Sequence, residues 1–224
     1  MRVAVVSFPG SNCDGDTLKA LYRLSVEAVA VWHREGDLKG AAAAILPGGF
    51  SYGDYLRAGA LAAHSPIMGA VRDLIARGGQ VLGICNGFQV LTESGLLPGA
   101  LAMNLSRRFQ CAWVTVRVET AVPGLSLRPG ETLRLPIANG EGRYLPDPAR
   151  PLGRDALGFL TYVGPDGALT SPNGSWDGVA GVCSPDGRVM GLMPHPERAS
   201  AAWLGGEDGL RFLGAWVRRT QVLR

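Results

Sequence analysis

The chain has 224 residues, of which 46% are hydrophobic, and its 22 basic and 19 acidic residues give a formal net charge of +3. This length favours a single domain over residues 1–224 with a sizeable buried core. The small, dispersed charge argues against a nucleic-acid-binding stripe, and we expect neither a membrane span nor a signal peptide. Four scattered cysteines without C-x-x-C spacing predict a reduced, cytoplasmic protein with no zinc site.

The first half of the chain alternates short apolar runs with amphipathic stretches. The apolar runs predict four strands, at 2–8, 26–32, 41–46 and 80–84. Helical spacing predicts three helices, over 16–24, 54–77 and 85–94, the second with a candidate interruption at Ser65-Pro66. Because the first run, 2–8, is short and apolar and ends at Pro9-Gly10, it is expected to be a buried strand of a parallel sheet.

The second half of the chain has strand candidates separated by turn sequences. Five strands are expected, at 110–118, 131–137, 157–163, 179–183 and 188–193. A last helix is expected over 207–220. Pro-Asp-Gly and Pro-Asn-Gly tripeptides mark several of the turns between them. The predicted fold class is therefore α/β, an open, largely parallel mixed sheet flanked by helices.

Cys85 is the first candidate for chemistry, because it lies in Gly83-Ile84-Cys85-Asn86-Gly87 between a predicted strand and a predicted helix. This G-x-nucleophile-x-G pattern is typical of a nucleophile elbow, a tight turn that lifts the nucleophile out of the sheet. Larger side chains than glycine would clash there, and the helix N-terminus favours a thiolate. The alternative is a buried structural cysteine, and this pattern alone does not separate the two.

The motif Pro194-His195-Pro196-Glu197 favours the catalytic interpretation. Pro196 biases His195 toward an extended backbone, in which residues two apart point to the same side. His195 and Glu197 can then serve as a general base and its orienting carboxylate, completing a Cys–His–Glu triad. The alternative is a surface loop with an incidental histidine. It is weakened because the other two histidines have no carboxylate at comparable spacing.

Pro47-Gly48-Gly49 follows another predicted strand. A glycine turn at that place can aim a backbone N–H at the oxyanion that forms when Cys85 attacks a carbonyl, and the second donor would be the N–H of Asn86. An isolated Gly-Gly is more often only a turn. No G-x-x-x-x-G-K-[ST] loop occurs in the sequence, so the chain is not expected to bind ATP by itself.

With these motifs in this order, the chain resembles the class I glutamine amidotransferases, whose fold is flavodoxin-like. Their nucleophile motif G-x-C-x-G-x-Q matches residues 83–89, and their base motif P-H-P-E matches residues 194–197. Within the family the chain is most similar to glutaminase subunits of de novo purine biosynthesis. The matching segments are 8–14, 47–57, 83–89, 140–144, 172–175 and 193–198. Asn139 and Ser171 depart from the family, which commonly has histidine and asparagine there.

The resemblance implies a nucleophile, a base with its orienter, two oxyanion donors and a contact to the amino-acid end of the substrate. By this resemblance Cys85 would be the nucleophile, His195 the base and Glu197 the carboxylate that orients it. Gly49 and Asn86 would be the oxyanion donors, and Gln89 would contact the amino-acid end of the substrate. It also implies that glutamine is hydrolysed through a thioester. The ammonia would pass to a large ATP-dependent synthetase subunit that converts formylglycinamide ribonucleotide to formylglycinamidine ribonucleotide, often with a small third subunit. No cofactor is expected in this chain, since ATP and Mg²⁺ would bind to the synthetase.

Two other functions stay open from the residues themselves. A cysteine hydrolase or peptidase on a similar elbow would convert peptide or ester substrates and leave glutamine untouched. A docking module without chemistry would have an unreactive thiol at Cys85, and Cys85→Ala would not affect its complex.

Overall fold

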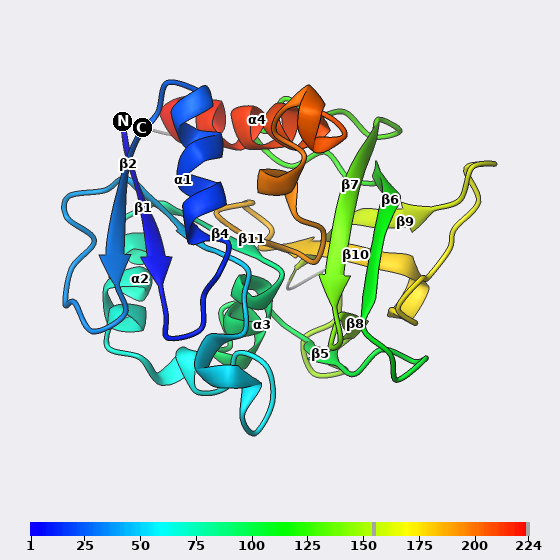
Figure 1. Ribbon diagram of the computed structural model, residues 1–224, viewed down its shortest axis with the longest axis horizontal. Helices are drawn as coiled ribbons and strands as arrows, with labels where there is room; N and C mark the ends of the chain where they lie inside the picture. Colours follow the sequence, from blue (N-terminus) through cyan, green and yellow to red (C-terminus); the bar gives the residue numbers. More distant parts are fainter. Residues whose placement is uncertain (154–155, 223–224) are drawn as a thin grey trace.

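The computed structural model of the chain describes residues 1–153 and 156–222. A nine-stranded sheet with strand order β2-β1-β3-β4-β11-β10-β9-β6-β7 forms its centre (Figure 1). The strands are β1 (Arg2–Ser7), β2 (Glu27–Trp32), β3 (Ala43–Leu46), β4 (Gln80–Ile84), β6 (Gln110–Val118), β7 (Thr132–Asn139), β9 (Leu157–Val163), β10 (Val179–Cys183) and β11 (Val189–Leu192). The five strands from β2 to β11 are parallel, and the remaining four extend the sheet in antiparallel fashion. The predicted mixed α/β sheet is confirmed.

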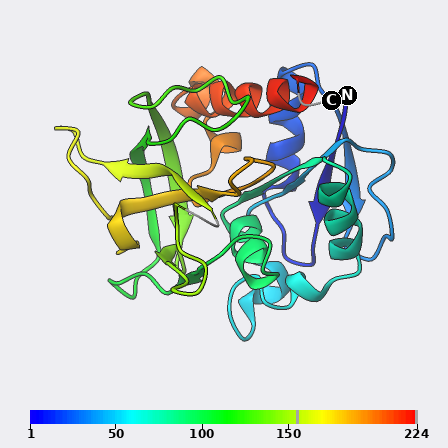
Figure 2. The same cartoon turned by 180° about the vertical axis from the view of Figure 1, so that it is seen from behind.

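Helices cover both faces of the parallel part of the sheet. They are α1 (Asp14–Arg23), α2 (Ile67–Ala76), α3 (Asn86–Glu93) and α4 (Asp208–Val222). Helices α1 and α4 lie together on one side, and α2 and α3 lie on the other (Figures 1 and 2). The strands β3 and β4 are fully buried for this reason, which explains their continuously apolar sequences. Among the described helices, none is both long and apolar enough to cross a lipid bilayer.

A second, two-stranded sheet pairs β5 (Ala100–Ala102) with β8 (Arg143–Leu145). Its strands are too short to produce a period-2 pattern, and the sequence did not predict them. Tyr144 of β8 is fully buried and stacks on Phe88 of α3, with ring centroids 6.1 Å apart. This contact fixes the preceding turn, residues 140–142, beside the helix that begins after Cys85.

The helix expected over 54–77 is wrong in its first half. Only Ile67–Ala76 is helical, and it begins directly after Pro66. The preceding segment forms two 3₁₀ turns, Ser51–Asp54 and Ala62–His64, joined by irregular backbone. Tyr52, Gly53, Asp54 and Leu56 all have positive φ, which reverses the chain and excludes an α-helix. Helix α1 also begins earlier than the sequence indicated, at Asp14, and has no side-chain cap.

The order of the central strands brings distant segments to one edge of the sheet. Strands β3, β4 and β11 are parallel neighbours, with Leu46 beside Gly83 and Ile84 beside Leu192. The chain therefore leaves all three strands at the same carboxyl edge, where open α/β sheets bind ligands. The segments that follow them contain the glycine turn, Cys85 and His195. The single domain over 1–224 stays a prediction.

Candidate active site

Cys85 forms the tight turn between β4 and α3. Its φ and ψ are 49° and −105°, a combination that L-residues rarely adopt, and its side chain is 5% exposed. A Cβ added to Gly87 would lie 1.9 Å from the Leu46 carbonyl oxygen, and one on Gly83 would lie 2.6 Å from the Gly87 carbonyl. Only glycine fits at either position, so the elbow that the sequence predicts is present.

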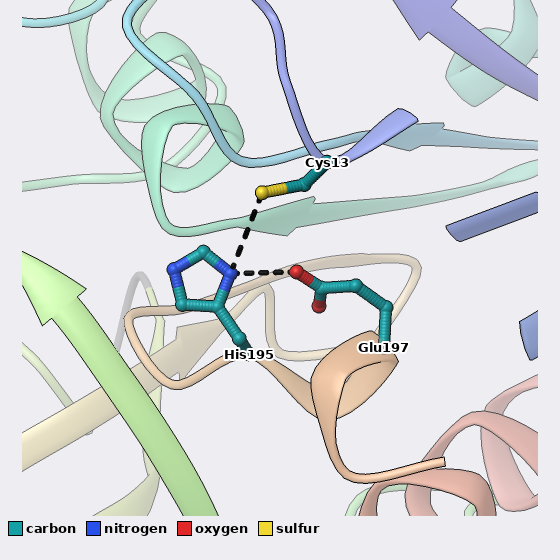
Figure 3. A group of neighbouring side chains, drawn as sticks. All are labelled: Cys13, His195 and Glu197. Atoms are coloured by element: carbon teal, nitrogen blue, oxygen red, sulfur yellow. Dashed lines mark hydrogen bonds and ion pairs between the residues drawn. The ribbon is translucent and has the colours of Figure 1, made fainter. Parts of the chain in front are cut away.

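His195 is held by a carboxylate and by a strand. Its Nδ1 lies 2.6 Å from Glu197 Oε1, and the two side chains are 1% and 0% exposed (Figure 3). His195 has extended backbone, Glu197 belongs to a 3₁₀ turn, and the His195 N–H donates to the Pro136 carbonyl of β7 at 2.8 Å. Figure 3 shows the second ring nitrogen pointing away from Glu197. That nitrogen, Nε2, makes no hydrogen bond to any described residue.

The charges around the imidazole favour its protonated form. Burial opposes protonation, but the negative charges of Glu197 and Cys85, with the Cys13 sulfur beside Nδ1, raise the pKa of His195 well above its usual value. The charge of Cys85 therefore affects the ring, although Nε2 has no hydrogen-bond partner among the described residues. The Cys85 Sγ also contacts the Ala138 carbonyl oxygen of β7, at 3.8 Å. This arrangement suits a cysteine nucleophile with an adjacent histidine as its general base.

The glycine turn after β3 packs directly against this pair. A Cβ on Gly48 would lie 2.6 Å from His195 Cε1, and one on Gly49, whose φ is 150°, would lie 2.8 Å from Ser11 Cα. Among the described residues, no hydrogen-bond acceptor is found for the backbone N–H of Gly49 or of Asn86. Both groups are therefore free to bind an oxyanion, as expected of the donors near a nucleophile elbow.

Gln89 lies on α3, one turn after Cys85, and is 4% exposed. Its Nε2 donates to the Glu141 carbonyl at 2.6 Å, and its Oε1 accepts from Asn86 Nδ2 at 2.9 Å. Both ends of the amide are thus engaged within the protein, and the expected contact of Gln89 to substrate stays a prediction. What the structure adds is a link between Gln89 and Asn86, the residue after the nucleophile.

Two acidic residues near the start of α3 were not identified from the sequence. Asn86 Nδ2 donates to Asp54 Oδ1 at 3.3 Å, and the Ala58 N–H donates to Glu141 Oε2 at 3.2 Å. Burial, and then the negative charge of Glu141, raise the pKa of Asp54 to about 6. Both residues lie within the segments that match the amidotransferases, and no local pattern marks them, because their proximity depends on the irregular 51–59 loop.

A third group, Cys13, His195 and Glu197, has the composition of a metal site. The possible ligand atoms lie within 4.8 Å of one another (Figure 3). However, Arg198 Nη2 donates to Cys13 Sγ at 2.9 Å, so a cation already occupies the neighbourhood of the sulfur. The 2.6 Å contact between His195 and Glu197 would also have to open for a metal to enter. The cluster is better explained as a histidine–carboxylate pair with a neighbouring thiol that accepts from Arg198.

The fold and this site define a glutamine amidotransferase with a cysteine nucleophile. Residues 1–207 match the CobB/CobQ-like glutamine amidotransferase domain, and the chain belongs to this family. It is 54% identical to phosphoribosylformylglycinamidine synthase subunit PurQ of Thermus thermophilus over 223 residues, 97% of this chain and 98% of the relative. It is 53% identical to the PurQ subunit of Rubrobacter xylanophilus over 226 residues, 99% and 100% of the two chains.

Solved structures agree with these relatives. A chain in the structure of PurLQS from Thermotoga maritima is 42% identical, with a TM-score of 0.87 over 100% of this chain and 99% of that one. A glutamine amidotransferase, also from Thermotoga maritima, is 17% identical, with a TM-score of 0.60 over 100% of this chain and 93% of that one. The second likeness shows the shared fold alone.

Proposed function

We propose that the chain is the glutaminase subunit of a phosphoribosylformylglycinamidine synthase. Near-complete matches to PurQ subunits support the assignment to this synthase. The observation that carries the chemistry is the buried pair of His195 and Glu197, 2.6 Å apart, beside a cysteine on a strained elbow. A docking module without chemistry does not require this combination with the free N–H groups of Gly49 and Asn86. A cysteine peptidase would use similar groups, and the near-complete matches to PurQ subunits argue against it.

The first step is attack of the Cys85 thiolate on the side-chain amide carbon of glutamine. The carbonyl oxygen then becomes an oxyanion, which the N–H groups of Gly49 and Asn86 stabilise. Because both donors are backbone groups held by the fold, they need no reorganisation when the charge develops. Gln89 keeps Asn86 in place through its hydrogen bond to the Asn86 side chain.

The second step is departure of the amide nitrogen. An amide anion is too basic to leave, so the imidazolium of His195 donates the proton that turns the nitrogen into ammonia. A glutamyl thioester remains on Cys85. His195, now neutral, accepts a proton from water, which hydrolyses the thioester to glutamate and regenerates the thiolate. Glu197 stabilises the charged form of His195 in both halves of the cycle.

Ammonia then passes to the synthetase subunit, which converts formylglycinamide ribonucleotide to formylglycinamidine ribonucleotide in de novo purine biosynthesis. Neutral ammonia is a nucleophile and ammonium is not, because protonation occupies the lone pair, so an enclosed passage between the subunits is required. A small third subunit completes the complex. ATP and Mg²⁺ bind to the synthetase, this chain holds no cofactor, and the complex works in the cytoplasm.

The test is reconstitution with the large and small subunits of such a synthase. We expect Cys85→Ala to abolish glutamate release and glutamine-dependent synthesis, while ammonium salts still drive synthesis. Cys111→Ala, which removes an exposed cysteine, is the matched control and should behave like the parent. Glutamine-dependent synthesis by Cys85→Ala would disprove the nucleophile, and conversion of peptides or esters with glutamine untouched would favour a peptidase.

A further inference from the structure

Cys13 is a second buried cysteine near the active site that the mechanism above does not use. It precedes α1 directly and is 0% exposed. Its N–H donates to the Gly48 carbonyl at 3.3 Å, and its carbonyl accepts from Thr17 N–H and Oγ1 at 2.9 and 2.8 Å. The backbone of Cys13 therefore ties the start of α1 to the glycine turn.

The side chain of Cys13 reaches the general base. Its Sγ lies 3.9 Å from His195 Nδ1, the nitrogen that Glu197 also contacts (Figure 3). It donates to Asn12 Oδ1 at 3.1 Å and accepts from Arg198 Nη2 at 2.9 Å. The sulfur therefore lies between the base and a cationic side chain.

The residues before Cys13 hold the glycine turn after β3 in place. The Phe50 N–H donates to the Gly10 carbonyl at 3.0 Å, and Ser11 forms a β-bridge with Gly49. A Cβ on Gly48 would lie 3.2 Å from Cys13 Sγ and 2.6 Å from His195 Cε1. The sulfur, the glycine turn and the imidazole therefore touch one another with no free space between them.

We propose that Cys13 is a positioning residue. It holds the imidazole of His195 in place against the glycine turn, and it keeps the Arg198 guanidinium away from Glu197. The inference rests on the proposed function of this site. Arg198 Nε already lies 3.9 Å from Glu197 Oε1. Without the sulfur as its acceptor, the guanidinium can move onto that carboxylate and compete with His195 for it.

If Arg198 competes with His195 for Glu197, the effect on the protonation of His195 depends on the charges that face the ring. They are Glu197 on its own segment, Cys85 from the elbow and Cys13 from the start of α1, with Arg198 behind the sulfur. Glu197 stabilises the imidazolium, so its loss to Arg198 makes His195 release its proton at lower pH. His195 must be protonated to release ammonia, and the basic limb of the pH–activity profile should therefore move to lower pH.

The experiment compares Cys13→Ala and Cys13→Ser with Cys183→Ala in the reconstituted complex. Cys183 is also 0% exposed but lies at the end of β10, so it controls for the loss of a buried thiol. For Cys13→Ala we expect kcat for glutamine to fall about 10- to 100-fold, as displaced catalytic groups commonly cause, with KM changed less than about threefold. The basic limb should move to lower pH, and Cys13→Ser should recover part of both losses.

A second variant separates positioning from packing. Arg198→Gln in the Cys13→Ala background removes the competing guanidinium and should return the basic limb toward its parental position. Equal losses of activity and Tm in Cys13→Ala and Cys183→Ala, with an unmoved basic limb, would overturn the inference. So would a folded Cys13→Ala with parental kcat and basic limb. Cys85→Ala is measured in the same assay. If Cys85→Ala is inactive, a negative result for the Cys13 variants concerns the role of Cys13 alone. If Cys85→Ala is active, the proposed function itself is rejected.

Discussion

Glu197 Oε1 accepts a hydrogen bond from His195 Nδ1 across 2.6 Å, and the pair is shielded from water, with side-chain exposures of 0% and 1%. Electrostatic attraction is strong in such a low-dielectric interior. The pair therefore fixes both the orientation of the ring and the charge that it carries.

Replacement of Glu197 by glutamine should remove that charge with little change in shape. We expect kcat/KM for glutamine to fall at least about 100-fold, the usual scale of general acid–base catalysis, because His195 loses its partner. The pKa of His195 falls, so the remaining activity should decline at lower pH than in the parent. A pH–rate profile of the reconstituted complex measures both effects. Glu207→Gln, at an exposed position, is the control. An unchanged profile in Glu197→Gln would contradict the assignment.

Gly48→Ala should damage catalysis by steric contact. The new methyl group would lie 2.6 Å from His195 Cε1, so the imidazole or the oxyanion turn has to shift. We expect kcat to fall about 100-fold, with an intact fold by circular dichroism. Gly69→Ala is the matched control, because a Cβ there meets nothing within 4 Å and the residue is helical. That variant should keep full activity and gain about 0.5–1 kcal/mol of stability. Parental activity in Gly48→Ala would show that the turn is not close to the base.

Asp54→Asn should stabilise the protein at neutral pH. The pKa of Asp54 is raised from 3.8 to about 6, so the folded state disfavours its charged form. Stability is therefore lost as pH rises from 3.8 through about 6, and it stays lower above that range. Asparagine keeps an acceptor for Asn86 and tolerates the positive φ at this position.

The measurement for Asp54→Asn is thermal unfolding across pH. Tm should exceed that of the parent at about pH 8, and the difference should disappear as the pH approaches about 4. Asp73→Asn, which removes an exposed carboxylate of α2, should show no such pH dependence. A Tm difference for Asp54→Asn that is the same at both pH values would contradict the raised pKa.

Alkylation should distinguish the cysteines by environment. A glutamine-like chloroketone should label Cys85 first, because it binds as substrate next to the activated thiol. A small, general reagent should instead favour the exposed Cys111. Cys183 should resist both reagents, since burial raises the pKa of its thiol to about 12. Peptide mapping with and without glutamine gives the order, and glutamine should protect Cys85 alone. Equal labelling of all four cysteines would exclude an activated thiol.

The parallel sheet and the three segments at its carboxyl edge could be predicted from the sequence. Apolar runs bounded by glycines predict β3 and β4, and the elbow and P-H-P-E motifs carry their chemistry within a few residues. Glu197 was predicted on an extended backbone and instead lies in a 3₁₀ turn, yet it still reaches His195. The contact was therefore predicted correctly, but the backbone geometry that produces it was not.

Contacts made by irregular backbone could not be predicted. Asp54 contacts Asn86, and Glu141 contacts Ala58, only because the 51–59 loop turns through several residues with positive φ, where helical spacing had indicated a helix. Cys13 reaches His195 across 182 positions of sequence, and nothing in its local pattern marks it as a neighbour of the base. Such residues are defined by tertiary packing, which local periodicity does not encode.

Trapping the covalent intermediate tests the central claim most directly. The reconstituted complex is mixed with glutamine, quenched in acid during turnover and analysed by intact-mass and peptide mass spectrometry. We expect one glutamyl group to be attached to this chain as a thioester on Cys85, and none to be attached to Cys85→Ala. Glutamate release by Cys85→Ala, or a glutamyl group on a different residue, would contradict the central claim.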